Sequence, residues 1–295
     1  MKNYIIVTGG AGFIGSNLIE LLLKKTNKKI ISLDNYSSGF KKNHIKSSQV
    51  KYIKGDTINI YNHLLKYKNK IQSIFHFGEF SRISQSFGKL NSCLKSNTIG
   101  SYEVFKFCLD NKIKLIYSAT SASLGNNGND KNLSPYSFTK SKNLELLENL
   151  KRWFNFKYEV VYFYNVYGFR QIKKGPMATV VGIFEDQYKN NKKLTVVKPG
   201  TQTRRFTHIK DTVEICYLAW KRNKCSHYSI SNKKSYSILE VANMFKSKIM
   251  LVKARKGERY SSSTTKFSQN NRIIQKYGKI NLKDYVTSFI KVSHL

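Results

Sequence analysis

Acidic side chains are scarce in this sequence. Its 295 residues include 17 aspartates and glutamates against 52 lysines and arginines, a formal net charge of +35 at pH 7. Such an excess can serve nucleic-acid binding, because lysine and arginine neutralise phosphates. Here the lysines are spread along the chain among Asn, Tyr and Ser, without a basic stripe, a basic tail or a known nucleic-acid-binding motif. The pattern favours a compositional bias towards Lys, Asn and Ile over nucleic-acid binding, although the field would attract an anionic substrate.

Cysteines are few, and long apolar runs are missing. Cys93, Cys108, Cys216 and Cys225 are far apart, with no close pair and no His/Cys ligand spacing. We therefore expect reduced thiols in a cytoplasmic protein, and no metal site. No apolar run is long enough to span a bilayer, and the first residues lead directly into a predicted strand. We expect neither a membrane segment nor a signal peptide.

A glycine-rich turn lies directly behind that first strand. The turn reads Thr8-Gly9-Gly10-Ala11-Gly12-Phe13-Ile14-Gly15 and leads into a helical stretch over 16–25. Gly9 allows a sharp turn, Gly12 lets a pyrophosphate approach the backbone, and Gly15 lets the helix pack closely on the sheet. Because the helix N-terminus presents free N–H groups, the segment predicts a dinucleotide phosphate site.

An acidic residue after the next strand supports this interpretation. Asp34 ends the predicted strand over 30–33, about 20 residues beyond the glycines. A carboxylate at this point accepts the hydroxyls of the adenosine ribose. The context favours a dinucleotide cradle over a glycine-rich turn of another α/β protein.

Strand-like and helix-like segments alternate through the first half of the chain. Further strands are expected at 50–53, 73–77, 114–117 and 159–163, and helices at 60–67, 91–111 and 135–154. This alternation predicts an α/β fold with a doubly wound parallel sheet of the Rossmann type, whose ligands lie at the carboxyl ends of the strands. We expect residues 1–167 to form an NAD-binding Rossmann domain, with return segments near 205–230. Residues 168–295 would form mainly a smaller, interleaved substrate-binding lobe.

Hydroxyl and amine groups gather at the later strand ends. Thr120 lies just after a predicted strand, and Tyr136 and Lys140 share one face of a helix at i, i+4 spacing. A free tyrosine has a pKa near ~10, and a nearby ammonium together with a positive nicotinamide ring lowers that pKa. Tyr136 could then take a proton from a sugar hydroxyl that Thr120 holds. Tyr-x-x-x-Lys is common by chance, so its weight comes from the order of the segments.

That order resembles the extended short-chain dehydrogenase/reductase family, in particular its NAD-dependent nucleotide-sugar epimerase/dehydratase branch, and most of all UDP-glucose/UDP-N-acetylglucosamine 4-epimerases. The resemblance covers nearly the whole chain. The similar segments are T-G-G-A-G-F-I-G at 8–15, L-D-N-Y-S-S-G at 33–39, G-D-T at 55–57, F-H-F-G at 75–78, N-T-I-G-S at 97–101, Y-N-V-Y-G at 164–168, G-T-Q-T-R at 200–204 and R-K-G-E at 255–258.

The resemblance implies the residues of the site. NAD would be bound by Gly9, Gly12, Phe13, Ile14, Gly15, Asp34, Asn35, Ser38, Gly39, Asp56, Thr57, Phe77, Gly78, Asn97, Tyr136, Lys140 and Tyr164. The nucleotide-sugar substrate would be bound by Thr120, Asn165, Arg204, Arg255 and Glu258. Thr120, Tyr136 and Lys140 would be catalytic, without a metal.

The resemblance also implies a homodimer, in which the helices over 91–111 and 135–154 pair across a two-fold axis. The apolar positions available there could equally pack inside the subunit. These positions are Val104, Phe105, Phe107, Leu144, Leu147 and Leu150.

Three departures from the family pattern bear on function. Glu79 stands after Gly78 where small residues are usual, either as a surface charge or as a partner of Arg82, and the sequence leaves both open. Arg205 replaces the usual aspartate, which would add charge beside the diphosphate. Ser121-Ala122 follow Thr120, where 4,6-dehydratases carry an Asp-Glu pair, which argues against dehydration.

The resemblance therefore implies an NAD-dependent epimerase that oxidises C4 of a nucleotide sugar to a 4-keto intermediate and reduces it again on the other face. One alternative is an ADP-heptose 6-epimerase-like enzyme, in which Lys174 would take part. That family prefers NADP, whereas Ser37, Ser38 and Gly39 follow Asp34 before any lysine. Another nucleotide-sugar oxidoreductase remains open, as does a non-enzymatic NAD-binding sensor or nucleic-acid-associated protein.

Overall fold

Eight parallel strands form one sheet within the residues that the computed structural model describes, which are 2–124, 130–261 and 273–293. The strand order is β14-β11-β6-β5-β4-β1-β2-β3, with every neighbouring pair parallel. The strands are β1 (Tyr4–Thr8), β2 (Lys29–Asp34), β3 (Val50–Lys54), β4 (Ile71–His76), β5 (Lys114–Thr120), β6 (Tyr158–Phe163), β11 (His227–Ser231) and β14 (Ile273–Tyr277). The Rossmann-type α/β fold predicted from the alternation of segments is confirmed.

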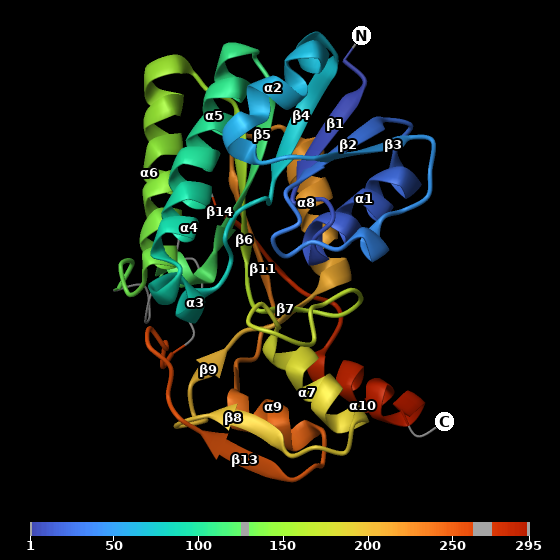
Figure 1. Ribbon diagram of the computed structural model, residues 1–295, viewed down its shortest axis with the longest axis vertical. Helices are drawn as coiled ribbons and strands as arrows, with labels where there is room; N and C mark the ends of the chain where they lie inside the picture. The colour runs from blue at the N-terminus through green and yellow to red at the C-terminus, as the bar shows by residue number, and fades with distance from the viewer. Residues whose placement is uncertain (1, 125–129, 262–272, 294–295) are drawn as a thin grey trace.

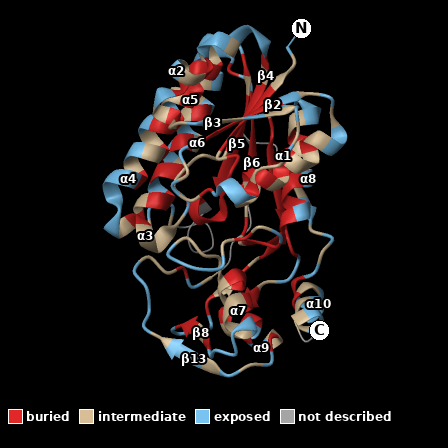
Figure 2. Ribbon diagram, turned by 45° about the vertical axis from the view of Figure 1, so that its right-hand side comes forward, coloured by how far each residue is buried: buried red, intermediate tan, exposed pale blue. Residues whose placement is uncertain are grey.

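Helices cover both faces of this sheet (Figure 1). On one face lie α2 (Ile60–Leu64), α3 (Ile83–Gly88), α4 (Leu90–Leu94), α5 (Ser101–Asp110) and α6 (Pro135–Phe154). On the other lie α1 (Phe13–Lys25) and α8 (Ile209–Arg222). Because successive strand side chains point to opposite faces, Ile6 of β1 joins the core under α5 and α6, whereas Ile5 and Val7 join the core under α1 and α8. Both layers leave the central strands buried, as the red centre of Figure 2 shows.

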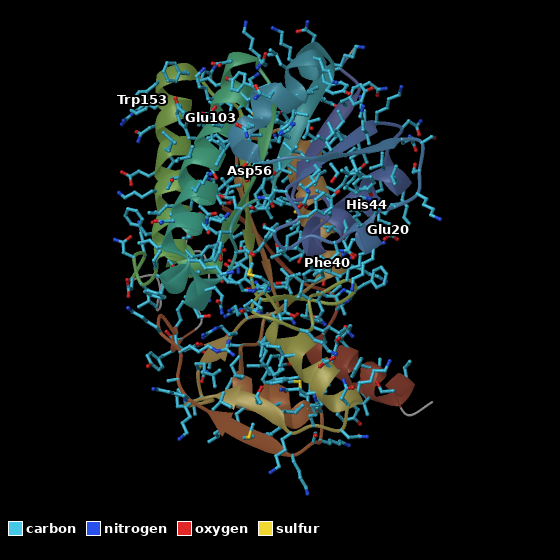
Figure 3. The ribbon with its side chains drawn as sticks, viewed as in Figure 1. Glu20, Phe40, His44, Asp56, Glu103 and Trp153 are labelled. Atoms are coloured by element: carbon cyan, nitrogen blue, oxygen red, sulfur yellow. The ribbon has the colours of Figure 1, made fainter. Side chains whose placement is uncertain are left out.

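Local sequence sets the start of α6, the helix that carries Tyr136 and Lys140. The Ser134 side chain accepts a hydrogen bond from the Ser137 backbone N–H, and Pro135 occupies the first turn, where a missing N–H costs nothing. The helix then runs over the span expected from the sequence, to Phe154, and the labelled Trp153 marks its far end in Figure 3.

The apolar positions named for a dimer interface pack within the subunit. Val104, Phe105, Phe107 and Leu147 are fully buried or nearly so, and Leu144 and Leu150 pack against the same core. Exposed large apolar side chains beside them include Ile99 and Tyr102, and Phe138, Trp153 and Phe154 on α6.

A smaller lobe lies below the carboxyl ends of the strands (Figure 1). Its elements are β8 (Leu194–Val197), β13 (Ile249–Val252), β9 (Thr203–Arg204), β12 (Tyr236–Ser237), α7 (Val180–Lys189), α9 (Ile238–Met244) and α10 (Leu282–Ser293). They enclose a core of their own, with Phe184, Phe206 and Phe245 at its centre. The short pair β7 (Val166–Tyr167) and β10 (Thr207–His208) joins the lobe to the domain.

The chain passes between the two units several times. From the lobe it returns through α8 and β11, crosses the lobe again, and returns once more as β14 before α10 ends in the lobe. The sequence placed the region of β14 mainly in the lobe, and residues 262–272 of that region lie outside the described residues. None of the helices in the described ranges is long and apolar enough to cross a membrane.

A buried carboxylate ties one of these returns to the sheet. Glu159 of β6 is fully buried, and it accepts the backbone N–H groups of Cys225 (3.0 Å) and Ser226 (2.8 Å) at the start of β11. The Lys114 ammonium lies 3.3 Å from the same carboxylate. The carboxylate therefore satisfies two backbone donors and one charge that would otherwise be buried unpaired.

We expect Glu159→Ala to lower the free energy of unfolding by about 3–5 kcal/mol, because it leaves the partners of a buried ion pair uncompensated. Urea unfolding followed by circular dichroism measures the loss. Glu145→Ala is the control, since this exposed glutamate pairs only with Lys142 on the surface, and its midpoint should stay close to that of the parent protein. Equal midpoints for the two variants would contradict the structural role of Glu159.

Candidate active site

A cleft of about 430 Å³ runs between the carboxyl ends of the strands and the lobe. Most of the residues predicted for the site line it. These are Gly9, Gly12, Phe13, Ile14, Gly15, Asp34, Asn35, Ser38, Thr57, Phe77, Gly78, Thr120, Tyr136, Lys140, Asn165, Arg204, Arg255 and Glu258. The topology explains the gathering, because parallel strands deliver the loops after their carboxyl ends to one edge of the sheet.

The glycine turn forms one wall of the cleft, and its backbone leaves no room for side chains. Gly9 has φ +69°, and a Cβ there would lie 2.9 Å from the backbone of Phe77. A Cβ on Gly15 would lie 2.2 Å from the Gly9 carbonyl oxygen. Helix α1 begins at Phe13 without a side-chain cap on its free N–H groups. A bare turn with uncapped donors at a helix start fits a dinucleotide pyrophosphate.

Asp34 lies beside this turn at the end of β2. Its carboxylate accepts the backbone N–H groups of Ala11 (2.9 Å) and Tyr36 (2.8 Å). Burial raises the pKa of Asp34, and these two hydrogen bonds oppose that shift. The neighbouring Asn35 amide donates to Asp56 (3.0 Å), which holds the loops after β2 and β3 together. A carboxylate held in this way fits the ribose end of the same cofactor.

Tyr136 projects into the cleft from the first turn of α6. Thr120, the last residue of β5, lines the cleft beside it, and its side chain acts to lower the pKa of the phenol. We expected a lowered pKa for this phenol. Instead, burial raises the pKa of Tyr136 to about 12, and the charge of Glu79 acts in the same direction. The phenol is therefore protonated at neutral pH in this structure.

Lys140 does not offset the raised pKa of Tyr136, because its ammonium is held elsewhere. Its ammonium forms an ion pair with Glu79 and donates to the carbonyl oxygen of Ser118, and it lies 4.6 Å from the centre of the Tyr117 ring. Both side chains of the pair are at most 4% exposed. Glu79 is thus neither a surface charge nor a partner of Arg82, the two options that the sequence left open.

Three further donors complete the surroundings of the Glu79 carboxylate. Its Oε1 accepts hydrogen bonds from the Ser101 hydroxyl (2.8 Å), the Tyr117 hydroxyl (3.1 Å) and the Asn143 amide (3.2 Å). Sequence analysis missed this network, because its members are spread over β4, β5, α5 and α6. The only signal was a glutamate in a motif where small residues are usual.

The network reaches the glycine turn through His76. The Thr8 hydroxyl oxygen accepts the N–H groups of Phe77 and Gly78, so its own proton goes to His76 Nδ1 (2.8 Å). Burial lowers the pKa of His76 to about 4, and the ring is neutral. Its Nε2–H then donates to Ser101 (3.1 Å), which in turn donates to Glu79. Thr8, at the end of β1, is thereby connected to Lys140 on α6.

Four of the residues predicted to bind NAD do not line the cleft, and their contacts are structural. Asn97 is fully buried, and its amide binds both the N–H and the carbonyl of Phe80. The Tyr164 hydroxyl lies 3.0 Å from that of Ser229 on β11. Gly39 packs against the Asp34 carboxylate. Asp56 caps the turn that begins at Thr57.

At the lobe end, the residues predicted to bind the diphosphate differ in burial and in ion pairing. Arg204 is buried and forms an ion pair with Glu258, whereas Arg255 is exposed. Arg205 does not add charge to the cleft, contrary to expectation. Its guanidinium donates to the carbonyl oxygens of Asn232 (3.0 Å) and Lys233 (2.7 Å). Because adjacent residues of an extended segment point to opposite sides, Arg204 and Arg205 cannot both face the cleft.

Two arginines of the cleft carried no predicted role. Arg82 donates to the carbonyl oxygen of Met177, which lies between β7 and α7. Arg259 donates to the carbonyl oxygen of Ser121, next to Thr120. Lys174, which a 6-epimerase would use, lies outside the cleft lining with its side chain 76% exposed, 3.4 Å from Asp186. Among the described residues, no group of His, Cys, Asp and Glu side chains could hold a metal ion, and the four cysteines are free.

Comparisons with known proteins identify the family of the chain and support its fold. The model of the NAD dependent epimerase/dehydratase family matches residues 5–231. An ADP-L-glycero-D-manno-heptose-6-epimerase of Brachyspira hyodysenteriae is 30% identical over 82% of this chain and 80% of its own length. The crystal structure of a UDP-glucose 4-epimerase from Thermotoga maritima, with UDP-glucose, has a TM-score of 0.85 at 22% identity and covers 98% of this chain and 97% of its own.

A dTDP-glucose 4,6-dehydratase from Streptomyces venezuelae, solved with NAD, has a TM-score of 0.85 at 18% identity and covers 98% of this chain and 96% of its own. At these identities the two crystal structures establish the fold, whereas the family match extends over more than half of the sequence. The matched residues include the glycine turn, Asp34 and Tyr136. The chain therefore belongs to the NAD-dependent epimerase/dehydratase family.

Proposed function

We propose that the protein epimerises a nucleotide sugar at C4 through a 4-keto sugar. The observation that carries this proposal is that Tyr136 and Thr120, both buried, line one cleft together with the glycine turn. The hydroxyl of a sugar bound there would lie beside Tyr136, which can exchange its proton, and Thr120, which can hold the hydroxyl in place. NAD, when bound, supplies the acceptor and donor of the C4 hydride.

In this proposal Tyr136 moves the proton of the C4 hydroxyl. The phenol oxygen takes that proton as the sugar is oxidised and gives it back when the 4-keto group is reduced. Since burial raises the pKa of Tyr136 to about 12, the phenol needs positive charge nearby before it can act as the base. Thr120 keeps the sugar hydroxyl within reach, and Glu79 fixes how much of the Lys140 charge reaches the phenol.

The two ends of the cleft would hold the rest of the ligands. The glycine turn and Asp34 would bind the pyrophosphate and ribose of NAD. Arg204, Arg255, Glu258 and Asn165 would hold the nucleotide end of the substrate and leave the sugar free to turn over between two reductions. A homodimer is also part of the proposal, because Ile99 and Tyr102 remain exposed beside α5.

A second candidate is 6-epimerisation of an ADP-heptose, which the 30% identical relative favours. The position of Lys174 speaks against it, since that ammonium lies outside the cleft lining, and so does Asp34, whose carboxylate repels the 2′-phosphate of NADP. Dehydration finds no support either, because Ser121 and Ala122 offer no acid or base beside Thr120.

The direct test is incubation of the purified protein with UDP-, ADP-, dTDP- and GDP-sugars, with products resolved by NMR. We expect a C4 epimer. Tyr136→Phe should lower kcat by about 10²–10⁴-fold, the range for loss of a general acid–base group, and leave NAD bound. Tyr277→Phe, at an exposed position of β14 outside the cleft lining, is the matched control. Retained turnover in Tyr136→Phe would place the base elsewhere, and a silent panel with NAD bound would reject epimerisation.

The Glu79–Lys140 pair predicts a pH effect. Glu79→Gln removes a negative charge that raises the pKa of Tyr136 and frees the Lys140 ammonium, so that pKa should fall. More phenolate then exists at each pH, and the acid limb of the kcat profile should move to lower pH by about one unit. Glu145→Gln is the surface control, and thermal melts monitor folding. An unmoved limb in a folded Glu79→Gln variant would refute the role of this pair.

Asp34 predicts the choice of cofactor. The parent protein should bind NAD more tightly than NADP, because like charges placed together cost several kcal/mol. Asp34→Asn should reduce the ratio of the NADP dissociation constant to the NAD dissociation constant by about tenfold or more, as measured by calorimetric titration. Asp110→Asn on the surface of α5 serves as the control. A preference for NADP in the parent protein would contradict this assignment and favour the second candidate.

A further inference from the structure

The cleft contains more positive charge than a diphosphate requires. Its cationic lining residues are Arg82, Lys140, Arg204, Arg255, Lys256 and Arg259. Its acidic lining residues are Asp34, Glu79 and Glu258. Glu79 pairs with Lys140 and Glu258 with Arg204, while Asp34 lies at the cofactor end. Four cations are therefore left without a carboxylate among the residues that the structure describes.

Arg259 is the most buried of these four. It is 4% exposed, and its Nη1 donates to the carbonyl oxygen of Ser121 (2.7 Å). Its Nε is buried and has no hydrogen-bond partner within the described part of the chain. Burial lowers the pKa of Arg259 to about 10, and the charge of Arg204 adds to this effect. A buried guanidinium with an open donor is a costly arrangement that an anion would relieve.

Arg82 carries a second uncompensated charge. Its Nε donates to the carbonyl oxygen of Met177 (3.1 Å), and its Nη1 donates to that of Ser81 (3.1 Å). Both acceptors are neutral, so they orient the guanidinium without cancelling its charge. Because Met177 belongs to the segment after β7, Arg82 lies where the domain and the lobe meet over the cleft.

The two arginines line the same cleft from neighbouring segments. Arg82 directly precedes α3, and the loop that leads to Arg259 packs on this helix, since a Cβ on Gly257 would lie 2.5 Å from the Phe87 ring. The charges of both guanidinium groups act on the Tyr136 phenol. Both therefore belong to the part of the cleft that contains Tyr136, where the sugar would lie.

The remaining two cations are placed for a different purpose. Arg255 and Lys256 are exposed at the lobe end, near Arg204 and Glu258. These groups suit a diphosphate, which brings its own two charges. Arg82 and Arg259 are then left for a further anion at the sugar.

We propose that the sugar of the substrate bears a carboxylate, as in a uronic acid, and that Arg82 and Arg259 bind it. Guanidinium groups suit this task, because their planar donors match a carboxylate in bidentate fashion. The proposal rests on the proposed function, since Tyr136 and Thr120 define where the sugar lies. A neutral sugar beside two arginines that only acidify the phenol is the competing explanation.

The test compares nucleotide sugars that differ only at C6. The NAD-loaded protein is titrated calorimetrically with UDP, UDP-glucose and UDP-glucuronate, and with the corresponding ADP set, while NMR follows epimerisation. We expect the glucuronate to bind about 10- to 100-fold more tightly than the glucose on the same base, the factor for an additional charged hydrogen bond. Equal or weaker binding of the glucuronate, or no binding in either set, overturns the carboxylate assignment.

Turnover separates this proposal from the first. Tight binding of a glucuronate without any epimer rejects the proposed reaction and keeps the carboxylate site. Epimerisation of the glucose with no preference for the glucuronate keeps the reaction and rejects the site.

Variants locate the preference. Arg82→Gln and Arg259→Gln should each reduce the ratio of glucuronate to glucose affinity by about tenfold or more, without an equal loss for the nucleotide diphosphate alone. Arg205→Gln is the matched control, because that guanidinium binds the carbonyl oxygens of Asn232 and Lys233 away from the cleft. If Arg82→Gln and Arg259→Gln weaken the diphosphate and both sugars alike, these arginines bind phosphate and the proposal fails.

Discussion

The carboxylate of Glu79 is buried between the loop after β4 and the elements β5, α5 and α6, and it is surrounded by Lys140 and three hydrogen-bond donors. A buried charge is tolerated only where an opposite charge and hydrogen bonds replace the lost water. The same contacts hold the loop after β4 against the helix that carries Tyr136, and through Ser101 and His76 they reach the glycine turn. The geometry of both the cofactor wall and the phenol therefore depends on this one ion pair, and the charge of Glu79 adds to the burial that raises the pKa of the phenol.

Much of the fold could be predicted from the sequence because the evidence for it is local. Strand and helix periods, the Ser134-Pro135 start of α6 and the glycine turn each act over a few residues. The partners of Lys140 could not be predicted in this way, because Glu79 lies 61 positions away and only packing decides which cation reaches it. Strand alternation at β9 could have shown that Arg205 turns away from Arg204, whereas a short edge strand such as β14 has little periodicity to detect.

Charge links the composition to the site. An excess of lysine and arginine over the whole chain says little about function, because solvated cations are neutralised by water and salt. The informative cations are the few that folding places in the cleft, of which Arg204 and Lys140 have carboxylates and Arg82 and Arg259 have none among the described residues. Because burial removes the competing water, the positions of these guanidinium groups indicate what kind of ligand the cleft binds.

The placement of β14 has a consequence for biosynthesis. The eighth strand of the sheet is encoded after nearly all of the lobe, and it pairs with β11 along the whole length of both strands. Until the ribosome has translated residue 277, β11 presents an open edge, which is the kind of surface on which nascent chains associate. The sheet of the N-terminal domain is therefore completed only after most of the lobe has been translated.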